Sequence, residues 1–497
     1  MLYGIKGYHT PSVNQLIAAV DNDMVNITTG LGYGVNLTLT NNVEFENFLQ
    51  RLFYQNFNNT PLTFNGTRWT RQHVGKLPIA KYLKAWKERM YLAYVQIRGT
   101  DYPSRVMYSD LPINDTIQWG YETGTNLATT AGSPRVTSAL AGFKGYNIKR
   151  GDPFFILSGS DAEQYSVKTI VSDLWLDLAD YNGNDVNLTT TATGVSYWVG
   201  SNWFDVERDD GDFITWIDVN QNIDNLLIFK RESLFRFDGT RRVRVKGAPG
   251  TTSGRSVVDT RDMTIYFFGG QGLETGFYAT DGSEAIKISN PIQKYIDGID
   301  ASLFTNGIIG WKENNLYRVY VGTITNSDYN ISITTPILTY DLDSQAWSID
   351  PQPKVIVAAT EFRQGGIKQA YIADTDEVFL TPSGNTHDGT GIKFSFEIGN
   401  IYPNKTHYSN TLTRLQVISE SAKGVKVLYR RKLTPFDSDQ EYTPLGDIKH
   451  DATWFNFPEN KNQCSGLDIK FEGISSTEST AIIKKLVLGI RRDTTII

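Results

Sequence analysis

The feature that most constrains the fold of this chain is a short motif that repeats along it. Its clearest copy occupies residues 210–239, which read DGDFITWIDVNQNIDNLLIFKRESLFRFDG. Three short apolar runs alternate there with polar turn residues, and an Asp-Gly pair closes the last run. Such runs predict strands of an antiparallel meander, because aromatic and β-branched residues favour strands and Asp-Gly supplies the positive φ of a tight turn. The breaks come too often for a helical period.

The motif recurs about six times. Each copy has an apolar run, a polar turn, a second apolar run that usually ends in an aromatic residue, and a turn such as Asp-Gly. The copies begin at Leu52, Met90, Leu226, Thr264, Asn315 and Ala370. Most neighbouring copies lie roughly 40 to 55 residues apart, the spacing expected of propeller blades with four short strands. We therefore predict an all-β fold with a β-propeller of about six blades, six to eight being possible.

The N-terminal residues before the first copy allow two interpretations. Residues 1–44 are rich in Gly and Asn and hold short strand candidates. They are either the first strands of the first blade or a strand that closes the ring by pairing with a C-terminal strand. Residues 44–54 also fit a helical period, which leaves a helical turn there as an alternative.

Two further domains interrupt and follow the repeats. From Tyr121 to about Asp205 the spacing of the motif is lost, and short strands are expected at residues 154–157, 165–171, 174–178 and 186–189, with a polar exit linker at 187–193. Past Gly384 separate strands without Asp-Gly closure follow. We predict propeller blades at 1–120 and 206–389, an inserted small β-barrel-like domain at 121–205, and a C-terminal β-sandwich at 390–497.

Charge and cysteine content exclude several classes of protein. The formal net charge of −6 does not favour strong non-specific binding to nucleic acid, and one cysteine, Cys464, permits neither an intrachain disulfide nor a thiolate metal cluster. The N-terminus lacks the pattern of a signal peptide and no apolar run could cross a bilayer, so we expect a soluble protein made in a cytosol, with no transmembrane segment.

Signatures of enzyme chemistry are sparse. The five histidines lack zinc-ligand spacing, and no nucleophile elbow, phosphate-binding loop or dinucleotide fingerprint occurs. The acidic run Glu207–Asp212 lacks the alternating ligands of a calcium loop, so a solvated turn is the better interpretation. Four carboxylates at blade turns are interpreted as structural, because Asp favours turns: Asp238, Asp281, Asp341 and Asp374. We therefore predict no catalytic residue, no metal, no cofactor, no small-molecule substrate and no enzyme activity.

Two groups of basic residues are the candidate contacts with a partner or with the phosphates of a channel. The first group is Arg241, Arg242, Arg244 and Lys246, which alternation places largely on one face of a strand. The second group is Lys81, Lys84 and Lys87, which lie between aromatic residues. The alternative for the first group is an exposed edge strand protected by charge, and for the second a solvated edge or loop.

The repeats resemble a known family. Four segments are similar to blades of virion proteins from short-tailed bacteriophages. They are the motif at 211–239, the SRVMYSD run at 104–110, residues 256–296 with the pattern G-x-Y-x-x-D-G … IS-x-PI, and ILTYDLDSQAWS at 337–348. The resemblance covers about Val43 to Gly384. It implies a tail nozzle or head-to-tail stabilisation protein, a structural component of the virion tail that assembles in the bacterial cytoplasm and carries no catalytic residues.

The same resemblance implies partners. Such proteins form a ring, usually of six copies, below the portal and adaptor, and double-stranded DNA passes through the ring channel without sequence-specific binding. The inserted barrel and the sandwich would then dock neighbouring subunits, tail-fibre proteins or the adaptor.

Two other classes of function remain open. A receptor- or carbohydrate-binding propeller would use some of the ten Trp and 26 Tyr residues to stack on sugars. A propeller hydrolase would need paired carboxylates near the central channel, and Asp281→Asn and Asp341→Asn are its first tests.

Overall fold

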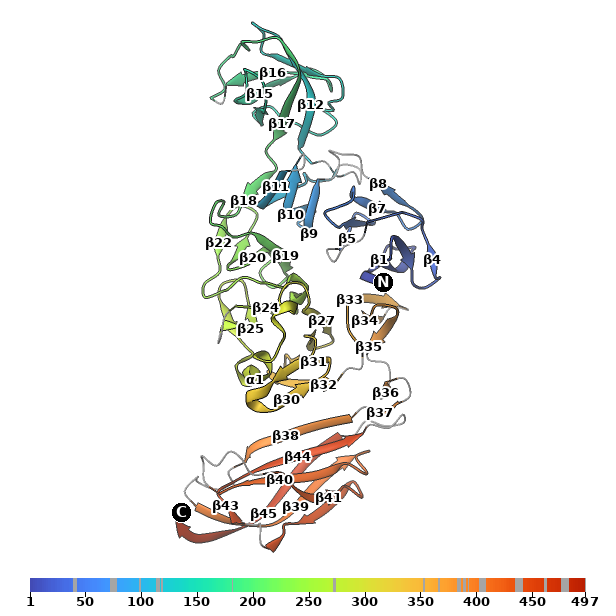
Figure 1. Cartoon of the computed structure of the whole chain (residues 1–497), viewed down its shortest axis with the longest axis vertical. Helices are drawn as coiled ribbons and strands as arrows, with labels where there is room; N and C mark the ends of the chain where they lie inside the picture. Colours follow the sequence, from blue (N-terminus) through green and yellow to red (C-terminus); the bar gives the residue numbers. More distant parts are fainter. Residues whose placement is uncertain are drawn as a thin grey trace. The chain divides into compact units, whose positions relative to one another are not determined.

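The computed structural model is almost entirely β-structure (Figure 1). It describes residues 1–38, 43–71, 78–97, 100–112, 117, 119–180, 182–270, 274–351, 354–364, 367–381, 386–387, 390–391, 393–401, 408–433, 441–459, 463–474 and 482–496. The chain forms two compact units, one of residues 1–347 with 354–381 and one of residues 348–353 with 382–497. The all-β prediction is confirmed.

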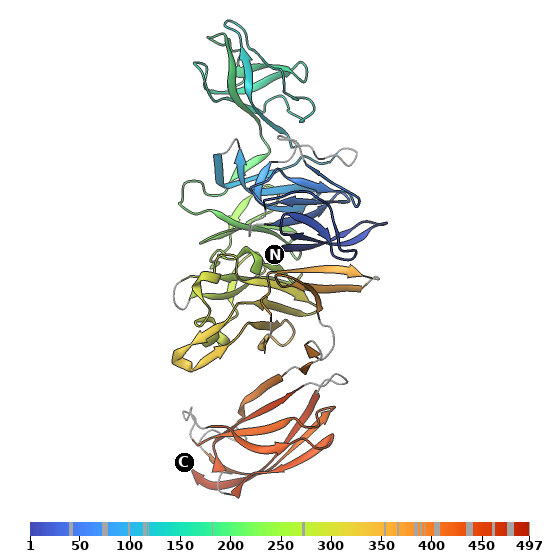
Figure 2. The same cartoon turned by 45° about the vertical axis from the view of Figure 1, so that its right-hand side comes forward.

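The first unit contains seven sheets of three or four antiparallel strands, here called blades 1 to 7 (Figures 1 and 2). Blade 1 consists of β1 (Leu2–His9), β2 (Asn14–Val20), β3 (Asp23–Asn26) and β4 (Leu31–Gly32), and blade 2 of β5 (Glu44–Phe48), β6 (Arg51–Gln55), β7 (Leu62–Phe64) and β8 (Trp69–Arg71). Blade 3 consists of β9 (Ile79–Trp86), β10 (Arg89–Ile97), β11 (Thr100–Tyr108) and β18 (Trp203–Asp205), and blade 4 of β19 (Ile214–Asn220), β20 (Asn225–Lys230), β21 (Leu234–Phe237) and β22 (Arg242–Arg244).

Blade 5 consists of β23 (Val258–Asp259), β24 (Thr264–Phe268), β25 (Gly276–Thr280) and β26 (Ala285–Lys287). Blade 6 consists of β27 (Ile309–Glu313), β28 (Leu316–Tyr320), β31 (Pro336–Asp341) and β32 (Ala346–Pro351). Blade 7 consists of β33 (Ala358–Gln364), β34 (Ile367–Ala373) and β35 (Val378–Thr381). A hairpin of β29 (Ile324–Asn326) and β30 (Ile331–Ile333) extends from blade 6. The short helical turns of the described residues are η1 (Gly254–Ser256), η3 (Asn290–Ile292), α1 (Gln293–Ile296), η4 (Ala301–Leu303) and η5 (Ser327–Tyr329).

The first strands of the blades contact one another in a ring. Strand β1 contacts β5 and β33, and β9, β19, β23 and β27 follow in chain order around the circle. The molecule is thus a seven-bladed propeller, within the predicted range. The six recognised repeats correspond to blades 2 to 7, and the N-terminal residues form a complete blade 1.

Ring closure differs from one of the two sequence interpretations. All four strands of blade 1 come from the N-terminal residues, so the alternative of a closing strand paired with a C-terminal strand is wrong for the described residues. The seam is held by buried Leu2, Ile5, Ala358 and Ala373, and by a hydrogen bond of 3.1 Å from Leu2 N to the carbonyl oxygen of Thr375. Apolar packing therefore closes the ring where a shared sheet does not.

The middle strand of the clearest motif shows why its apolar run is continuous. In β20, Leu226 and Ile228 pack against blade 3, whereas Leu227 and Phe229 pack against blade 5. Successive side chains of a strand point to opposite faces, so a strand covered on both faces needs apolar residues at every position.

The turns also follow the residue chemistry. Asp238, Asp281, Asp341 and Asp374 each accept hydrogen bonds through Oδ1 from the backbone N–H groups two and three residues later. Their interpretation as structural turn residues agrees with this geometry. The Ser383-Gly384 turn proposed for the last repeat lies outside the described residues.

Residues 44–54 form no helix. They form the hairpin of β5 and β6, whose two loop residues, Leu49 and Gln50, have φ values of 49° and 56°. Two consecutive positive φ values define the tight turn that matches the twist of paired strands. The helical alternative is wrong because the apolar spacing spans a chain reversal.

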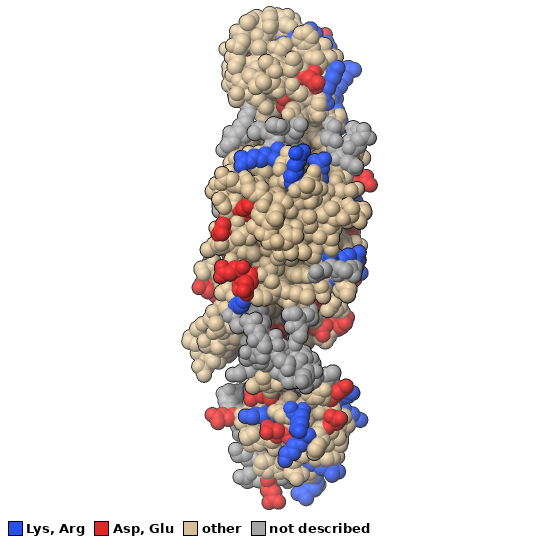
Figure 3. Space-filling view, turned by 90° about the vertical axis from the view of Figure 1, so that its right-hand side faces the viewer, with Lys and Arg blue, Asp and Glu red and all other residues tan. Residues whose placement is uncertain are grey.

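The inserted domain is a closed six-stranded barrel. Its strands are β12 (Tyr121–Thr129), β13 (Arg135–Ser138), β14 (Pro153–Ile156), β15 (Gln164–Ile170), β16 (Trp175–Asp180) and β17 (Ala192–Gly200), paired in the closed order β12-β13-β16-β15-β14-β17. The barrel lies between β11 and β18, so the chain completes blade 3 only after the barrel. On the face visible in Figure 3 the barrel carries few charges.

The predicted strand at 186–189 and the predicted exit linker at 187–193 are wrong. Residues 186–189 are not a strand, and β17 already begins at Ala192. The reason is Asp161, whose carboxylate accepts hydrogen bonds from the backbone N–H and the hydroxyl of both Thr189 and Thr190. This segment is therefore tied to the barrel.

The second unit is a β-sandwich. One sheet has the order β38 (Lys393–Ile401), β44 (Gly466–Ile474), β40 (Lys426–Lys432) and β41 (Thr443–Asp447), and the other contains β42 (Ala452–Asn456), β39 (Tyr408–Glu420), β43 (Gln463–Cys464) and β45 (Ile482–Ile496). Leu415 and Val417 of one sheet pack against Val427 and Phe471 of the other. The unit also contains the short strands β36 (Thr386–His387) and β37 (Thr390–Gly391).

Among the described residues, no helix has the length and apolar character that crossing a membrane requires.

Candidate functional site

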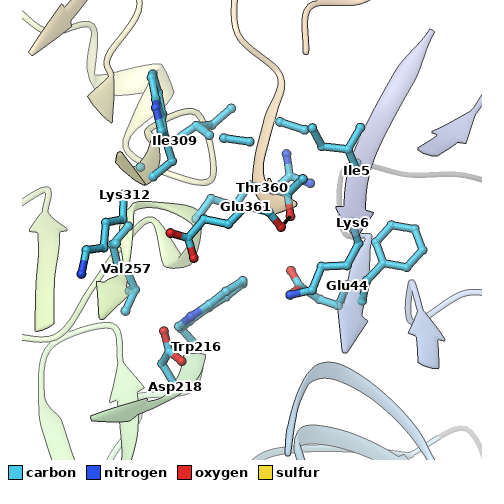
Figure 4. A pocket seen from close by; sticks show the side chains of 18 of the residues that line it. Ile5, Lys6, Glu44, Trp216, Asp218, Val257, Ile309, Lys312, Thr360 and Glu361 are labelled. Carbon is cyan, nitrogen blue, oxygen red and sulfur yellow. Dashed lines mark hydrogen bonds between the residues drawn. The ribbon is translucent and has the colours of Figure 1, made fainter. Parts of the chain in front are cut away.

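The centre of the propeller contains a cavity of about 350 Å³. Its walls come from the first strand of every blade, namely β1, β5, β9, β19, β23, β27 and β33, and from η1. Figure 4 shows side chains from these strands around one central space. We call this space the axial cavity.

The axial cavity is lined by equal numbers of cationic and anionic side chains. Every first strand contributes one, and Arg255 from η1 adds another. The cations are Lys6, Lys84, Arg255 and Lys312, and the carboxylates are Glu44, Asp218, Asp259 and Glu361. Cations and carboxylates therefore face the same space, and its net charge depends on the protonation of the carboxylates.

Several of these charges tie neighbouring blades together. Lys84 Nζ of blade 3 lies 2.7 Å from Asp218 Oδ1 of blade 4, and Lys6 Nζ of blade 1 lies 3.8 Å from Glu46 Oε2 of blade 2. The Arg255 guanidinium donates to the carbonyl oxygens of Val357 and Tyr3, each at 3.3 Å. Burial opposes the charge of Lys84, but Asp218 and Glu46 outweigh it and raise the pKa of Lys84.

Two carboxyl groups in the cavity have pKa values that are raised towards neutral pH. Burial raises the pKa of Glu44 to about 8, against the opposing effect of the Arg255, Lys6 and Lys84 cations. Burial, together with the nearby Asp218 charge, raises the pKa of Asp259 to about 6. A carboxyl group with a pKa close to 7 can donate as well as accept a proton.

Three side chains of the cavity wall have polar atoms without hydrogen-bond partners among the described residues. They are both carboxylate oxygens of Asp259 and the indole Nε1 atoms of Trp216 and Trp311, all of them buried. The backbone N–H groups of Arg261 and Gln221 moderate the pKa of Asp259, but neither reaches it with hydrogen-bond geometry. Buried polar groups are normally paired, so these atoms mark a place for a polar guest.

The second group of predicted basic contacts divides between two environments. Lys84 lies inside the axial cavity, paired with Asp218. Lys81 Nζ lies 3.3 Å from the ring centroid of Tyr94 and 5.1 Å from that of Phe57, a cation–π contact. Lys87 is on the surface, 3.4 Å from Asp224 and over the Trp86 ring. The structure does not bring the three ammonium groups to one surface.

The first group of predicted basic contacts is brought together. Arg242 and Arg244 belong to β22, the exposed outer strand of blade 4, and Arg241 and Lys246 flank it. All four are exposed. The Arg242 guanidinium reaches the carbonyl oxygen of Asp205 and the ring of Phe204.

The acidic run Glu207–Asp212 surrounds an internal cation. The side chain of Lys230 is completely buried, and its ammonium donates to the carbonyl oxygens of Val206 and Glu207, at 3.2 and 3.1 Å, and to the Asp210 carboxylate. The run is an exposed turn before β19, as the sequence predicts, and its contacts with Lys230 also make it a cage for that ammonium group. In the part of the chain that the structure describes, no three His, Cys, Asp or Glu residues form a metal-binding group.

Sequence reasoning missed the axial cavity. A usable signal was present in β19, where Trp216 and Asp218 are two residues apart and so share one face of the first strand of the clearest motif. The position of Asp259 beside them depends on how blades 4 and 5 meet, which no local pattern encodes.

Comparisons with known proteins show no family for this chain. No family model and no curated protein matches the sequence. Similar solved structures include the phage phi92 endosialidase (9% identity, 78% of this chain and 52% of that chain, TM-score 0.22) and the Malassezia sympodialis allergen Mala s 1 (9%, 67% and 86%, 0.27). A Trypanosoma rangeli sialidase is also similar (9%, 86% and 92%, 0.23). The chain spans about half the length of the endosialidase.

These comparisons correct one prediction. Two of the three similar structures are named as sialidases, which are enzymes, so the prediction that the chain is not an enzyme is contradicted. Identities of 9% and these TM-scores carry no argument about a reaction or about corresponding residues. A phage protein is among the similar structures, and none of the comparisons bears on a nozzle role.

Proposed function

We propose that the chain is a carbohydrate-binding β-propeller whose axial cavity receives a small saccharide unit. The observation that carries this proposal is the set of unpartnered polar atoms in the cavity wall, formed by the Asp259 carboxylate and the indole N–H groups of Trp216 and Trp311. A sugar presents hydroxyl groups that both donate and accept, which suits one acceptor and two donors around one space.

The cavity chemistry supports a sugar over other small ligands. Its volume of about 350 Å³ is within the range of small-molecule pockets, and it combines indole rings with charged groups. Indole rings cover the apolar faces of sugars, and carboxylates and ammonium groups bind hydroxyls. Because cations and carboxylates both line the cavity, a ligand rich in hydroxyl groups finds donors and acceptors there.

The test is saturation-transfer NMR with a panel of neutral and acidic mono-, di- and trisaccharides. We expect the wild type to bind a member of the panel. Asp259→Asn, which removes the carboxylate charge and one acceptor oxygen but keeps the side-chain shape, and Trp216→Phe, which removes the indole N–H together with part of the ring surface, should each weaken binding by about tenfold, the loss expected for a hydrogen bond to a buried group. Trp454→Phe, on the exposed surface of the sandwich, is the matched control.

Two results would contradict the proposal. One is the absence of binding to every saccharide of the panel, and the other is binding that Asp259→Asn and Trp216→Phe leave unchanged. A cleavage assay with the bound saccharide then separates recognition from hydrolysis, since Glu44 and Asp259 have the raised pKa values that a general acid needs.

We also propose a second function, a ring-forming component of a bacteriophage tail. The specific observation that favours it is the attachment of two separate β-domains, the inserted barrel and the sandwich, to a propeller, the organisation that the sequence resemblance implies for such proteins. Each added domain provides a surface for docking a neighbouring copy, an adaptor or a fibre protein. The axial cavity is too small for duplex DNA, so a DNA channel would have to lie between the copies of a ring.

Electron microscopy tests this second proposal. The purified chain, alone or mixed with the adaptor protein, should form closed rings, and we expect six copies in each ring. A chain that remains monomeric at all concentrations by mass photometry, and that antibodies fail to detect in virions, would rule the proposal out.

A further inference from the structure

The outer edge of blade 4 carries basic side chains that are in ion-pair contact with no acid of the described residues. Arg242, Arg244 and Lys246 are exposed and form no ion pair with a described residue, whereas the cations near them in the chain, Lys230 and Arg231, are paired. Elsewhere the propeller pairs many of its surface and cavity charges. This edge, called here the basic strip, is thus an unsatisfied concentration of positive charge on an acidic protein.

The geometry of the basic strip is regular. Strand β22 is the last strand of blade 4, paired only with β21, so its outer side is open. Alternate residues of a strand lie about 7 Å apart on one face, which spaces Arg242 and Arg244 along β22. Lys246 follows two residues beyond the strand, where its backbone forms a bridge with Glu284 next to β26 of blade 5. A line of separated cations fits an extended polyanion and not a compact ion.

A groove of about 560 Å³ adjoins the strip between blades 4 and 5. It is lined by Arg244 and Lys246, by the carboxylates of Glu232 and Glu274, and by the ring of Tyr278. Glu232 and Glu274 are both exposed. Glu232 Oε1 accepts a hydrogen bond of 2.9 Å from Arg231 Nε, which leaves further acceptor positions on this carboxylate for a ligand. The groove therefore offers cations, acceptors and an aromatic wall together.

This combination discriminates between polyanions. A nucleic acid carries a charge about every 1.7 Å along the duplex and presents mostly acceptors, so two carboxylates in the groove would repel it. An acidic polysaccharide carries carboxylates separated by sugar rings that are rich in hydroxyl donors. Its carboxylates pair with Arg244 and Lys246, and its hydroxyls donate to Glu232 and Glu274.

We propose that the basic strip and its groove bind an extended acidic polysaccharide. The site is separate from the axial cavity, and its ligand class rests on the proposed carbohydrate-binding function. The strip holds the charged polymer along β22.

The test measures binding of a fluorescent decamer of galacturonic acid by anisotropy at 50 to 300 mM NaCl. The wild type should bind it more tightly than the fully methyl-esterified decamer and than a 24-base-pair DNA duplex at the same salt. Arg244→Gln combined with Lys246→Gln should lower the affinity about 100-fold, or tenfold for each lost cation, and should reduce its salt dependence. Lys423→Gln combined with Lys449→Gln, two exposed lysines of the sandwich, is the charge-matched control and should change little.

Three outcomes would overturn the inference: tighter binding of DNA than of the decamer, equal binding of the charged and esterified decamers, or no effect of the Arg244 and Lys246 substitutions. These outcomes are distinguishable from failure of the axial-cavity proposal, because Asp259→Asn weakens cavity binding and leaves the strip intact.

Discussion

Replacing Asp259 by Asn should stabilise the protein while it weakens saccharide binding. The Asp259 carboxylate is buried without a hydrogen-bond partner among the described residues. Burial, and to a lesser extent the nearby Asp218 charge, raises the pKa of Asp259 from 3.8 to about 6. Folding must therefore either remove charge from this group or keep an unfavourable charge. Asparagine has nearly the same shape and carries no charge.

The expected magnitude follows from the pKa. A rise of about two units corresponds to about 3 kcal/mol at neutral pH, since one unit is about 1.4 kcal/mol, and solvent screening of this half-buried residue reduces the effect to about 2 kcal/mol. Because the pKa is higher in the folded than in the unfolded chain, the folded state binds the proton more tightly between about pH 4 and pH 6. Wild-type stability should therefore increase as the pH falls through this window, and the advantage of Asp259→Asn should vanish near pH 4.

The assay is thermal unfolding of both proteins at pH 7.0, 5.5 and 4.0, followed by tryptophan fluorescence. At pH 7 we expect the propeller transition of Asp259→Asn about 4 °C above that of the wild type, and at pH 4 the two transitions should coincide. Asp281→Asn is the control with the opposite sign, because hydrogen bonds from Ser283 lower the pKa of Asp281 and its loss should destabilise the turn. A destabilised Asp259→Asn at pH 7 would refute the reasoning.

Three further substitutions test other parts of the structure. Lys230→Met should cost about 3 kcal/mol of stability, because it leaves the carbonyl oxygens of Val206 and Glu207 and the Asp210 carboxylate without their buried donor. Hydrogen exchange of the backbone amides at 206–212 should accelerate. An unchanged exchange rate, or stabilisation of the wild type by calcium, would contradict the cage. Asp161→Asn should cost the barrel about 2 kcal/mol at pH 7, measured by urea denaturation. Because hydrogen bonds from Thr189 and Thr190 outweigh burial and lower the pKa of Asp161 to about 2, the wild type should lose this advantage as the pH falls from about 4 towards 2. Arg105→Lys should cost about 2 kcal/mol by thermal unfolding, since lysine cannot keep both the two-bond contact with Asp205 and the stacking on Trp203, and equal stability would contradict this account.

The blade repeat could be predicted from the sequence because each blade is local. Its strands are neighbours in the chain, its turns carry their own Asp caps, and its apolar runs record that both faces are covered, as Leu226 to Phe229 show. Blade 1 was harder to recognise because its strands contain Gly4, Gly7, Ala18 and Ala19 in place of large apolar residues. The two glycines are needed because a Cβ atom at Gly4 would meet Val43 and one at Gly7 would meet Phe362.

The candidate site could not be predicted because it is a property of the ring. The axial cavity takes one charged side chain from each of seven strands that are far apart in the sequence, so no spacing rule links Glu44 to Asp259. The basic strip, by contrast, comes from one short stretch of the chain, residues 242–246, and its alternating arginines were visible in the sequence. What the sequence lacked was the neighbouring blade, which adds Glu274 and Tyr278 to the groove.

The barrel enters and leaves the propeller at one point, because its first residue, Tyr121, is the strand partner of its last, Gly200. A chain that goes out and comes back at the same place can be shortened there without stretching the rest. Joining the two ends with a short Gly-Ser bridge should leave β18 free to complete blade 3, and another small domain with adjacent termini could take the place of the barrel. The surface that the propeller presents to a partner at this position can therefore be exchanged by replacing one domain, without changing the blades.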